Sequence, residues 1–248
     1  MIVPVTHQQR VLVVSAHPAD FCVRAGGLLA RYVAGGVPAR VLVMSSGARG
    51  ESNEMWKATQ GKTTEAEVAE VRRREALAAA KILGVDIIFY GYSDQPLAVD
   101  PERLMRLCRD IKEFRPTVIL THPKEEPYNP DHSAACRATL EAAYNATLAG
   151  VHPDLPTITP PQVYAFEPTQ PLVEMTGFLP DTFIDITDVM DKKMQATAEF
   201  RVQPYHVERY RARAASRAAQ ASYVAGNPEI KFAEAFQRYT PWCGNLLP

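Results

Sequence analysis

Residues 11–20, VLVVSAHPAD, decide the fold, because an apolar run changes abruptly into a polar turn. The β-branched residues 11–16 predict a buried strand, and residues 24–34 behind them predict a helix that ends at a Gly-Gly pair. A buried strand followed closely by a helix is typical of a sheet whose strands run parallel. The segment therefore predicts an open α/β sheet whose first strand ends beside His17 and Asp20.

The alternation of short apolar runs with helical patterns continues to about residue 150. We expect further strands at 40–45, 87–90 and 117–121, a polar loop at 47–64, and helices at 65–83, 101–114 and 130–149. Short apolar strands separated by helices predict a mostly parallel sheet that is covered on both faces. The fold class is therefore α/β, a Rossmann-like layer sandwich.

The composition changes after residue 150. Residues 153–180 are rich in proline, and further strands are expected at 162–166 and 182–186, with Arg-rich helices at 189–203 and 205–225. We interpret residues 1–248 as a single domain. Its Rossmann-like core covers about 10–150, and a proline-rich connection with a helical C-terminal part covers about 151–248.

Length and charge exclude several classes of protein. The 248 residues are 46% hydrophobic and 22% charged, which suits one globular domain. A formal net charge of −1 argues against nucleic acid or an anionic membrane as partner. The apolar runs are shorter than the roughly 20 residues of a membrane helix, and the N-terminus lacks a signal-peptide pattern. Four scattered cysteines favour free thiols and a cytoplasmic location.

Polar residues gather where the first four predicted strands end, which is where open parallel sheets bind ligands. These ends carry, in chain order, His17 with Asp20, Arg49 with Glu51, Asp94, and His122 with Asn129, Asp131 and His132. One polar strand end is ordinary, whereas four together indicate an active site.

His17, Asp20 and His132 have the chemistry of a zinc site, because two imidazoles and one carboxylate leave a position open for water or substrate. A turn residue and a helix N-cap are the alternative interpretation of His17 and Asp20. Asp131 is either an N-cap or a carboxylate that orients a histidine ligand. His122 fits a ligand, an oxyanion donor or a support for another histidine, and we favour the support.

Asp94 either orients a zinc histidine or begins the turn before Pro96. Glu51 lies on a loop that Gly47 and Gly50 make flexible, so it could reach over the metal as a base. A solvated loop carboxylate or a helix cap is its alternative. We expect His206, in the helix at 205–225, to lie at the surface, and the alternative is that it reaches the site of a neighbouring subunit.

The chain resembles the PIG-L, or LmbE-like, family of zinc-dependent N-deacetylases, which have a Rossmann-like fold. The resemblance lies in the His-Pro-x-Asp turn at 17–20 and the Pro-Asp-His of 130–132, and it extends to residues 184–187 and 233–236. It implies that His17, Asp20 and His132 are ligands of Zn²⁺.

Three positions depart from the deacetylase pattern. Ala19 stands where those enzymes have an aspartate as general base, Phe21 replaces a glutamate, and Asn129 replaces the histidine thought to stabilise the oxyanion. Alanine cannot accept a proton, so the usual activation of water is missing. An N-deacetylase acting on an amino sugar or related amide is therefore the second hypothesis, and an inactive metal-binding domain is the third.

The departures themselves resemble one branch of the family, the 4-oxalomesaconate hydratases of gallate and protocatechuate degradation. That branch shares Ala-Asp-Phe at 19–21, Arg-Ala-Gly-Gly at 24–27, Gly-x-Arg-Gly-Glu-Ser at 47–52 and Trp-Lys at 56–57. The resemblance implies a zinc-dependent hydro-lyase that converts 4-oxalomesaconate into 4-carboxy-4-hydroxy-2-oxoadipate, with the metal polarising the oxo-carboxylate and Glu51 as base.

An oxo-tricarboxylate substrate needs positive charge in its site. We expect Arg49 and Arg24 to bind its carboxylates, because a guanidinium grips a carboxylate with two hydrogen bonds. Asn129 is expected to contact the substrate as well. The Arg-rich C-terminal helices favour a homo-oligomer, with a hexamer as one option.

Overall fold

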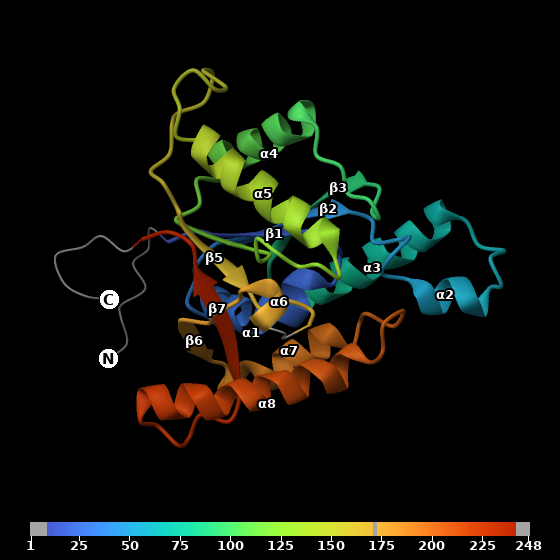
Figure 1. Cartoon of the computed structure of the whole chain (residues 1–248), viewed down its shortest axis with the longest axis vertical. Helices are drawn as coiled ribbons and strands as arrows, with labels where there is room; N and C mark the ends of the chain where they lie inside the picture. The colour runs from blue at the N-terminus through green and yellow to red at the C-terminus, as the bar shows by residue number, and fades with distance from the viewer. Residues whose placement is uncertain (1–8, 171–172, 242–248) are drawn as a thin grey trace.

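One seven-stranded sheet runs through the protein (Figure 1), whose computed structural model describes residues 9–170 and 173–241. The strand order is β3-β2-β1-β4-β5-β7-β6. Five strands are parallel: β1 (Val11–Ser15), β2 (Ala39–Ser45), β3 (Asp86–Tyr92), β4 (Val118–Thr121) and β5 (Gln162–Phe166). β7 (Ala233–Arg238) runs antiparallel to both β5 and β6 (Thr182–Asp185). The mostly parallel α/β sheet predicted from the sequence is confirmed.

Helices cover both faces of the sheet, as Figure 1 shows. One face carries α1 (Asp20–Ala34), α3 (Glu65–Leu83) and α7 (Met190–Thr197), and the other carries α4 (Pro101–Phe114) and α5 (Pro130–Asn145). Along β1, Val11 and Val13 pack into the first layer, whereas Leu12 and Val14 pack into the second. A strand buried on both faces has no polar alternation, which explains the continuous apolar run in the sequence.

Two helices begin and end where local chemistry predicts. α3 starts at a capping box in which Thr64 and Glu67 exchange hydrogen bonds, and it ends at Gly84 in the left-handed conformation. Asp100 caps α4, whose first residue is Pro101.

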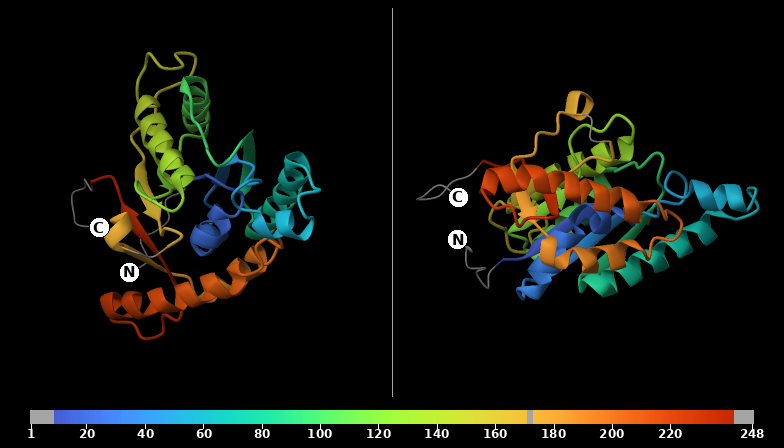
Figure 2. Two further views of the ribbon diagram at one scale, coloured as in Figure 1. Left: turned by 45° about the vertical axis from the view of Figure 1, so that its right-hand side comes forward. Right: turned by 90° about the horizontal axis from the view of Figure 1, so that it is seen from below.

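α8 (His206–Ala225) lies across the outer side of the layer formed by α1 and α7 (Figure 2).

Several expected boundaries were wrong. The loop at 47–64 contains the short helix α2 (Asn53–Ala58), which buries no residue and so leaves no apolar pattern to detect. α1 begins at residue 20 and not 24, and α5 ends at 145 and not 149. The helix expected at 189–203 consists of the turn η1 (Thr187–Val189), α7 and an irregular segment at 198–205.

α6 (Val173–Thr176) and β7 were not predicted. Residues 233–238, AEAFQR, have the composition of a helix, and they form a strand because β5 and β6 flank them with backbone partners. The C-terminal part thus adds strands to the same sheet. The single domain over 1–248 stays a prediction, since residues 1–8, 171–172 and 242–248 lie outside the described chain.

Three of the four cysteines, Cys22, Cys108 and Cys136, are buried free thiols, as expected, and Cys243 lies outside the described residues. Within the described residues, no helix combines the length and apolar character that crossing a bilayer requires.

Candidate metal centre and catalytic cavity

The candidate site lies beside β1, where the strand order reverses: β2 and β3 lie on one side of β1, and β4 and β5 lie on the other. β1 is flanked by β2 on one side and by β4 on the other, so the loops after β1 and β4 diverge and leave a crevice between them. His17 and Asp20 follow β1, and Asn129, Asp131 and His132 follow β4 at the start of α5. The topology therefore brings together residues more than 100 positions apart.

His17, Asp20 and His132 form one buried cluster. His17 Nδ1 lies 3.2 Å from His132 Nε2 and 3.5 Å from Asp20 Oδ2, and His132 Nε2 lies 3.6 Å from Asp20 Oδ1. Each residue offers a ligand atom, and the three atoms lie within 4.8 Å of one another. The structure thus brings together the three residues that the sequence predicted as metal ligands.

Two further carboxylates set the protonation of the two histidines. Asp131 Oδ2 lies 3.1 Å from His17 Nε2, and Glu126 Oε2 lies 2.8 Å from His132 Nδ1. A carboxylate accepts a hydrogen bond, so each of these ring nitrogens carries the proton and the opposite nitrogen presents a lone pair. The two lone pairs and Asp20 then face one small space. This donor set fits a zinc ion.

The charges around His17 also favour a cation. Burial lowers the pKa of His17, but Glu51, Asp131 and Asp20 outweigh burial and raise this pKa to about 10. Burial raises the pKa of Asp20, yet nearby histidines, His132 foremost, hold it well below its usual value. The negative charge of the cluster therefore attracts either a proton or a metal ion.

His122 supports the cluster from behind. Its Nε2 accepts the backbone N–H of Ala16 at 2.9 Å, and its ring stacks on His132 with the centroids 4.0 Å apart. Burial, followed by the charge of His132, lowers the pKa of His122 to about 3, so the ring is neutral. A second group of possible ligands, His122, Glu126 and His132, lies here. In this second group His122 Nε2 accepts the Ala16 N–H, which leaves the proton of the neutral ring on Nδ1, and His132 Nδ1 is bonded to Glu126, so the first group is the better metal site.

Glu51 lies on the loop after β2, against the three candidate ligands His17, Asp20 and His132, which we call the metal cluster. Its Oε1 is 3.7 Å from His17 Nδ1, and the loop is held by Asp94, whose carboxylate accepts the backbone N–H groups of Arg49 and Gly50. Burial raises the pKa of Glu51, but His17 and other positive groups lower it overall. Asp94 thus supports the loop that carries Glu51. Among the described residues, its hydrogen bonds go to that loop and not to a histidine.

A cavity of about 220 Å³ opens beside these residues. Ala19, Asp20, Glu51 and Asn129 are among the residues that line it. Its other walls come from four segments far apart in the chain, and they include Arg24, Tyr128, Thr169, Gln170, Gln203, Tyr205, His206, Arg209 and Tyr210. The start of α8 therefore contributes much of the cavity wall.

The two arginines predicted to bind substrate lie differently. Arg24 lines the cavity, but it is buried and engaged by Asp20, by the carbonyl of Glu167 and by Thr169. Arg49 does not line the cavity, and its half-exposed guanidinium pairs with Glu65 at 3.0 Å. Arg209 lines the cavity and stacks on Tyr205, with no carboxylate partner among the described residues.

Sequence reasoning missed Glu126, Gln203 and Arg209, and it wrongly placed His206 at the surface. His206 is buried and lines the cavity, because the preceding segment turns the first residues of α8 inward. An acidic residue four positions after His122 was a usable signal for Glu126. Gln203 and Arg209 had none, because only the packing of α8 brings them to the site.

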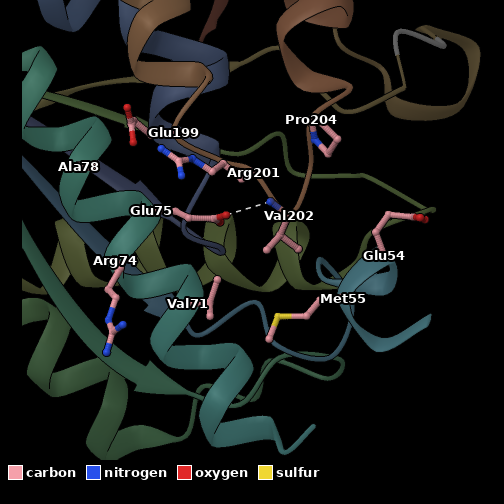
Figure 3. A pocket seen from close by; sticks show the side chains of 10 residues that line it. All are labelled: Glu54, Met55, Val71, Arg74, Glu75, Ala78, Glu199, Arg201, Val202 and Pro204. Atoms are coloured by element: carbon pink, nitrogen blue, oxygen red, sulfur yellow. Dashed lines mark hydrogen bonds between the residues drawn. The ribbon is translucent and has the colours of Figure 1, made fainter. Parts of the chain in front are cut away.

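A second hollow, a groove of about 750 Å³, lies between α2, α3 and the segment at 199–204 (Figure 3). Met55, Val71 and Val202 contribute apolar side chains, and Glu75 lies on its inner wall. None of the metal-cluster residues lines this groove. The candidate catalytic cavity is therefore the smaller of the two hollows.

Comparison with known proteins identifies the family. The family model for PIG-L, GlcNAc-PI de-N-acetylase, matches residues 12–143. The chain belongs to the PIG-L family. The matched segment covers β1 through most of α5 and so contains all three candidate metal ligands.

Within the PIG-L family the chain is similar to hydratases. It is 40% identical over 239 residues to a 4-oxalmesaconate hydratase from Pseudomonas putida KT2440, covering 95% of this chain and 91% of the relative. A crystal structure of GalB, the 4-carboxy-2-hydroxymuconate hydratase from the same strain, superposes with a TM-score of 0.92 at 39% identity, over 97% of this chain and 100% of that chain. A diacetylchitobiose deacetylase from Thermococcus kodakarensis is 28% identical over 201 residues, 78% of this chain and 69% of the relative.

Proposed function

We propose that this PIG-L protein is a zinc-dependent hydro-lyase that adds water to 4-oxalomesaconate and forms 4-carboxy-4-hydroxy-2-oxoadipate. The similarity to two hydratases over nearly the whole chain supports the reaction class. The observation that carries the proposal is local. Ala19 and Glu51 both line the cavity, so the turn after β1 offers no second carboxylate, and the loop after β2 supplies one.

His17, Asp20 and His132 would hold the zinc ion. When bound, the ion supplies a Lewis acid for the oxo-carboxylate end of the substrate. Asp131 and Glu126 bond to the opposite nitrogens of the two histidines and would leave their remaining lone pairs free for the ion. Asn129 Nδ2 lies 3.0 Å from His132 Nε2 and 3.2 Å from Glu51 Oε1, so it could donate either to Glu51 or to a substrate oxygen.

Glu51 would act as the base. It takes a proton from water while the water oxygen bonds to the double-bond carbon that carries a carboxylate. The electron pair of that double bond moves toward the oxo-carboxylate group, and Glu51 then returns its proton to the neighbouring carbon, which completes the addition of H and OH and regenerates the carboxylate. Glu51 is a carboxylate, which is ionised at neutral pH and can therefore accept the first proton.

Arg209 would receive a carboxylate of the substrate. Arg209 is the better placed, because its charge faces the cavity without a carboxylate partner among the described residues. Arg24 is already committed to Asp20 and to the loop after β5, so its role is to hold that loop. We further propose that the protein acts in gallate or protocatechuate degradation, in the cytoplasm and as a homo-oligomer.

The test adds 4-oxalomesaconate to zinc-loaded protein and follows the loss of its conjugated ultraviolet absorbance. We expect rapid loss that needs zinc and that falls about 10²- to 10⁴-fold in Glu51→Gln, which keeps the shape of the side chain and removes the base. Glu54→Gln, on the exposed face of α2, is the matched control and keeps wild-type activity. Absence of hydration by metal-loaded wild type, together with amine release from N-acetyl sugars, would establish the deacetylase instead.

A further inference from the structure

Both carboxylate oxygens of Glu51 are held by side-chain amides. Asn129 Nδ2 lies 3.2 Å from Oε1, and Gln203 Nε2 donates to Oε2 at 2.8 Å. Gln203 is 3% exposed, so little water competes for this contact. An amide NH₂ group only donates hydrogen bonds, and it therefore favours the ionised form of Glu51.

A buried arginine decides which end of the Gln203 amide faces Glu51. Arg72 Nη2 donates to Gln203 Oε1 at 2.5 Å. A guanidinium has no acceptor, so the amide oxygen must face Arg72 and the NH₂ group must face Glu51. Without that charge the amide could rotate and present its oxygen, which would repel the carboxylate.

Arg72 is itself fixed on α3. It is 0% exposed, and its Nη1 donates to Glu75 Oε2 at 2.8 Å, one helical turn away. The other oxygen of Glu75 accepts the backbone N–H of Val202 at 2.8 Å, a bond drawn in Figure 3. The pair Arg72–Glu75 therefore attaches the segment at 199–204 to α3 directly before Gln203 (Figure 3).

The cost of burying this pair argues for a specific role. Two charges removed from water are stabilising only if their remaining donors and acceptors find partners. Here Gln203 Oε1 accepts from Arg72 Nη2, and the Val202 N–H donates to the second oxygen of Glu75, whereas Nε of Arg72 has no hydrogen-bond partner among the described residues. The result is one continuous chain of hydrogen bonds from α3 to the carboxylate of Glu51.

We propose that Gln203 is a positioning residue for Glu51, and that Arg72 and Glu75 set its orientation. This inference rests on the proposed role of Glu51 as base. Gln203 keeps one oxygen of Glu51 turned away from the metal cluster, so that the other, 3.7 Å from His17 Nδ1, stays directed at the reacting water. Asn129 holds that second oxygen from the opposite side.

The first test is Gln203→Met, which keeps the length of the side chain and removes the donor. A misplacement of about 1 Å costs about 100-fold in rate, so we expect kcat to fall about 10- to 100-fold while KM changes less than about threefold. In a Glu51→Ala background the same substitution should change the residual rate less than about twofold, because the residue it acts through is gone. An equal loss in both backgrounds would overturn the proposal.

Gln203→Glu covers the case in which Gln203→Met does not fold. It retains an acceptor for Arg72 and places a second carboxylate against Glu51, so we expect a similar or larger loss of kcat. Gln220→Met is the matched control, because Gln220 is exposed on α8, far along the helix from the cavity, and accepts a hydrogen bond from Arg217 at 2.7 Å.

Crystal structures of wild type and the Gln203 variants separate this inference from the proposed function. We expect the carboxylate of Glu51 to leave its wild-type position in each variant. An unmoved Glu51 overturns the positioning role whether or not the protein hydrates 4-oxalomesaconate. A displaced Glu51 in a protein without hydratase activity supports the positioning role and contradicts only the assigned reaction.

Discussion

Asp131→Asn examines how the carboxylate behind His17 prepares the metal site. Oδ2 of Asp131 lies 3.1 Å from His17 Nε2 and accepts the N–H of Gln95 at 2.9 Å, while Oδ1 accepts the N–H of Leu97 at 2.7 Å. Asparagine has nearly the same shape but only one side-chain oxygen, so it cannot accept hydrogen bonds both at the side of His17 and Gln95 and at the side of Leu97. The substitution therefore removes an acceptor from one side or the other.

Each orientation of the new amide has a measurable cost. If its NH₂ group faces His17, Nε2 of that ring must accept a hydrogen bond, the proton moves to Nδ1, and the ligand lone pair is lost. Zinc affinity should then fall about 10- to 100-fold, or about 1.4–2.7 kcal/mol. If the NH₂ group faces Leu97, a buried N–H loses its acceptor at a cost of about 1–3 kcal/mol in folding stability.

The assay measures both quantities on one preparation. Competition with a chromogenic chelator gives the zinc affinity, and urea denaturation of metal-free protein gives the free energy of unfolding. Asp154→Asn, an exposed residue paired with Arg109, is the control and should leave both unchanged. Wild-type zinc affinity together with wild-type stability in Asp131→Asn would refute the reasoning.

Three further outcomes are expected. Arg209→Ala should raise KM for the tricarboxylate about tenfold or more, because a charge-assisted hydrogen bond is lost. Arg49→Ala is the control, because Arg49 lies outside the cavity, and it should leave KM within about twofold. Equal effects on KM would contradict the placement of these two residues. Burial, opposed by Glu51 and reinforced by Arg72, Arg209 and Arg24, lowers the pKa of His206 to about 4 from 6.5. Between these values only the unfolded chain binds the proton, so stability falls as the pH drops from 6.5 to 4, by at most about 1.4 kcal/mol per pH unit. His206→Asn should flatten that slope in denaturation at pH 7, 6, 5 and 4, and an unchanged slope would contradict the shift. Gly27→Ala places a Cβ 2.6 Å from Ile186 and should cost about 1–3 kcal/mol in urea unfolding. Gly26→Ala places its Cβ 3.3 Å from Lys193 and should cost less; the reverse order would show that α1 packs differently.

Local sequence patterns predicted the elements whose signals lie within themselves. The strand predicted at 162–166 and the helix predicted at 101–114 match the structure residue for residue. A run of residues with high β-propensity marks the strand, and a proline at its first position marks the helix. β7 escaped prediction because pairing with two neighbouring strands overrides its helical composition. Short α2 escaped because it buries nothing.

The candidate site divides in the same way. Its residues at strand ends could be found from sequence, since the end of a buried parallel strand is marked by the change from apolar to polar residues. Arg49 was selected for its position beside Glu51, but its side chain turns outward to Glu65. The direction of an exposed side chain on a loop depends on its partners, which sequence order does not reveal.

The sequence by itself determined the α/β class, the PIG-L family and the set of histidines and carboxylates at the strand ends, because these follow from periodicity and from motifs within a few residues. Only the tertiary structure decided how that set is used. It placed Asp131 and Glu126 behind the two histidines, and it brought Gln203 from 152 positions away to Glu51. The physical reason is that hydrogen bonds and charges act across space, so their partners become known only once the sheet and α8 have packed.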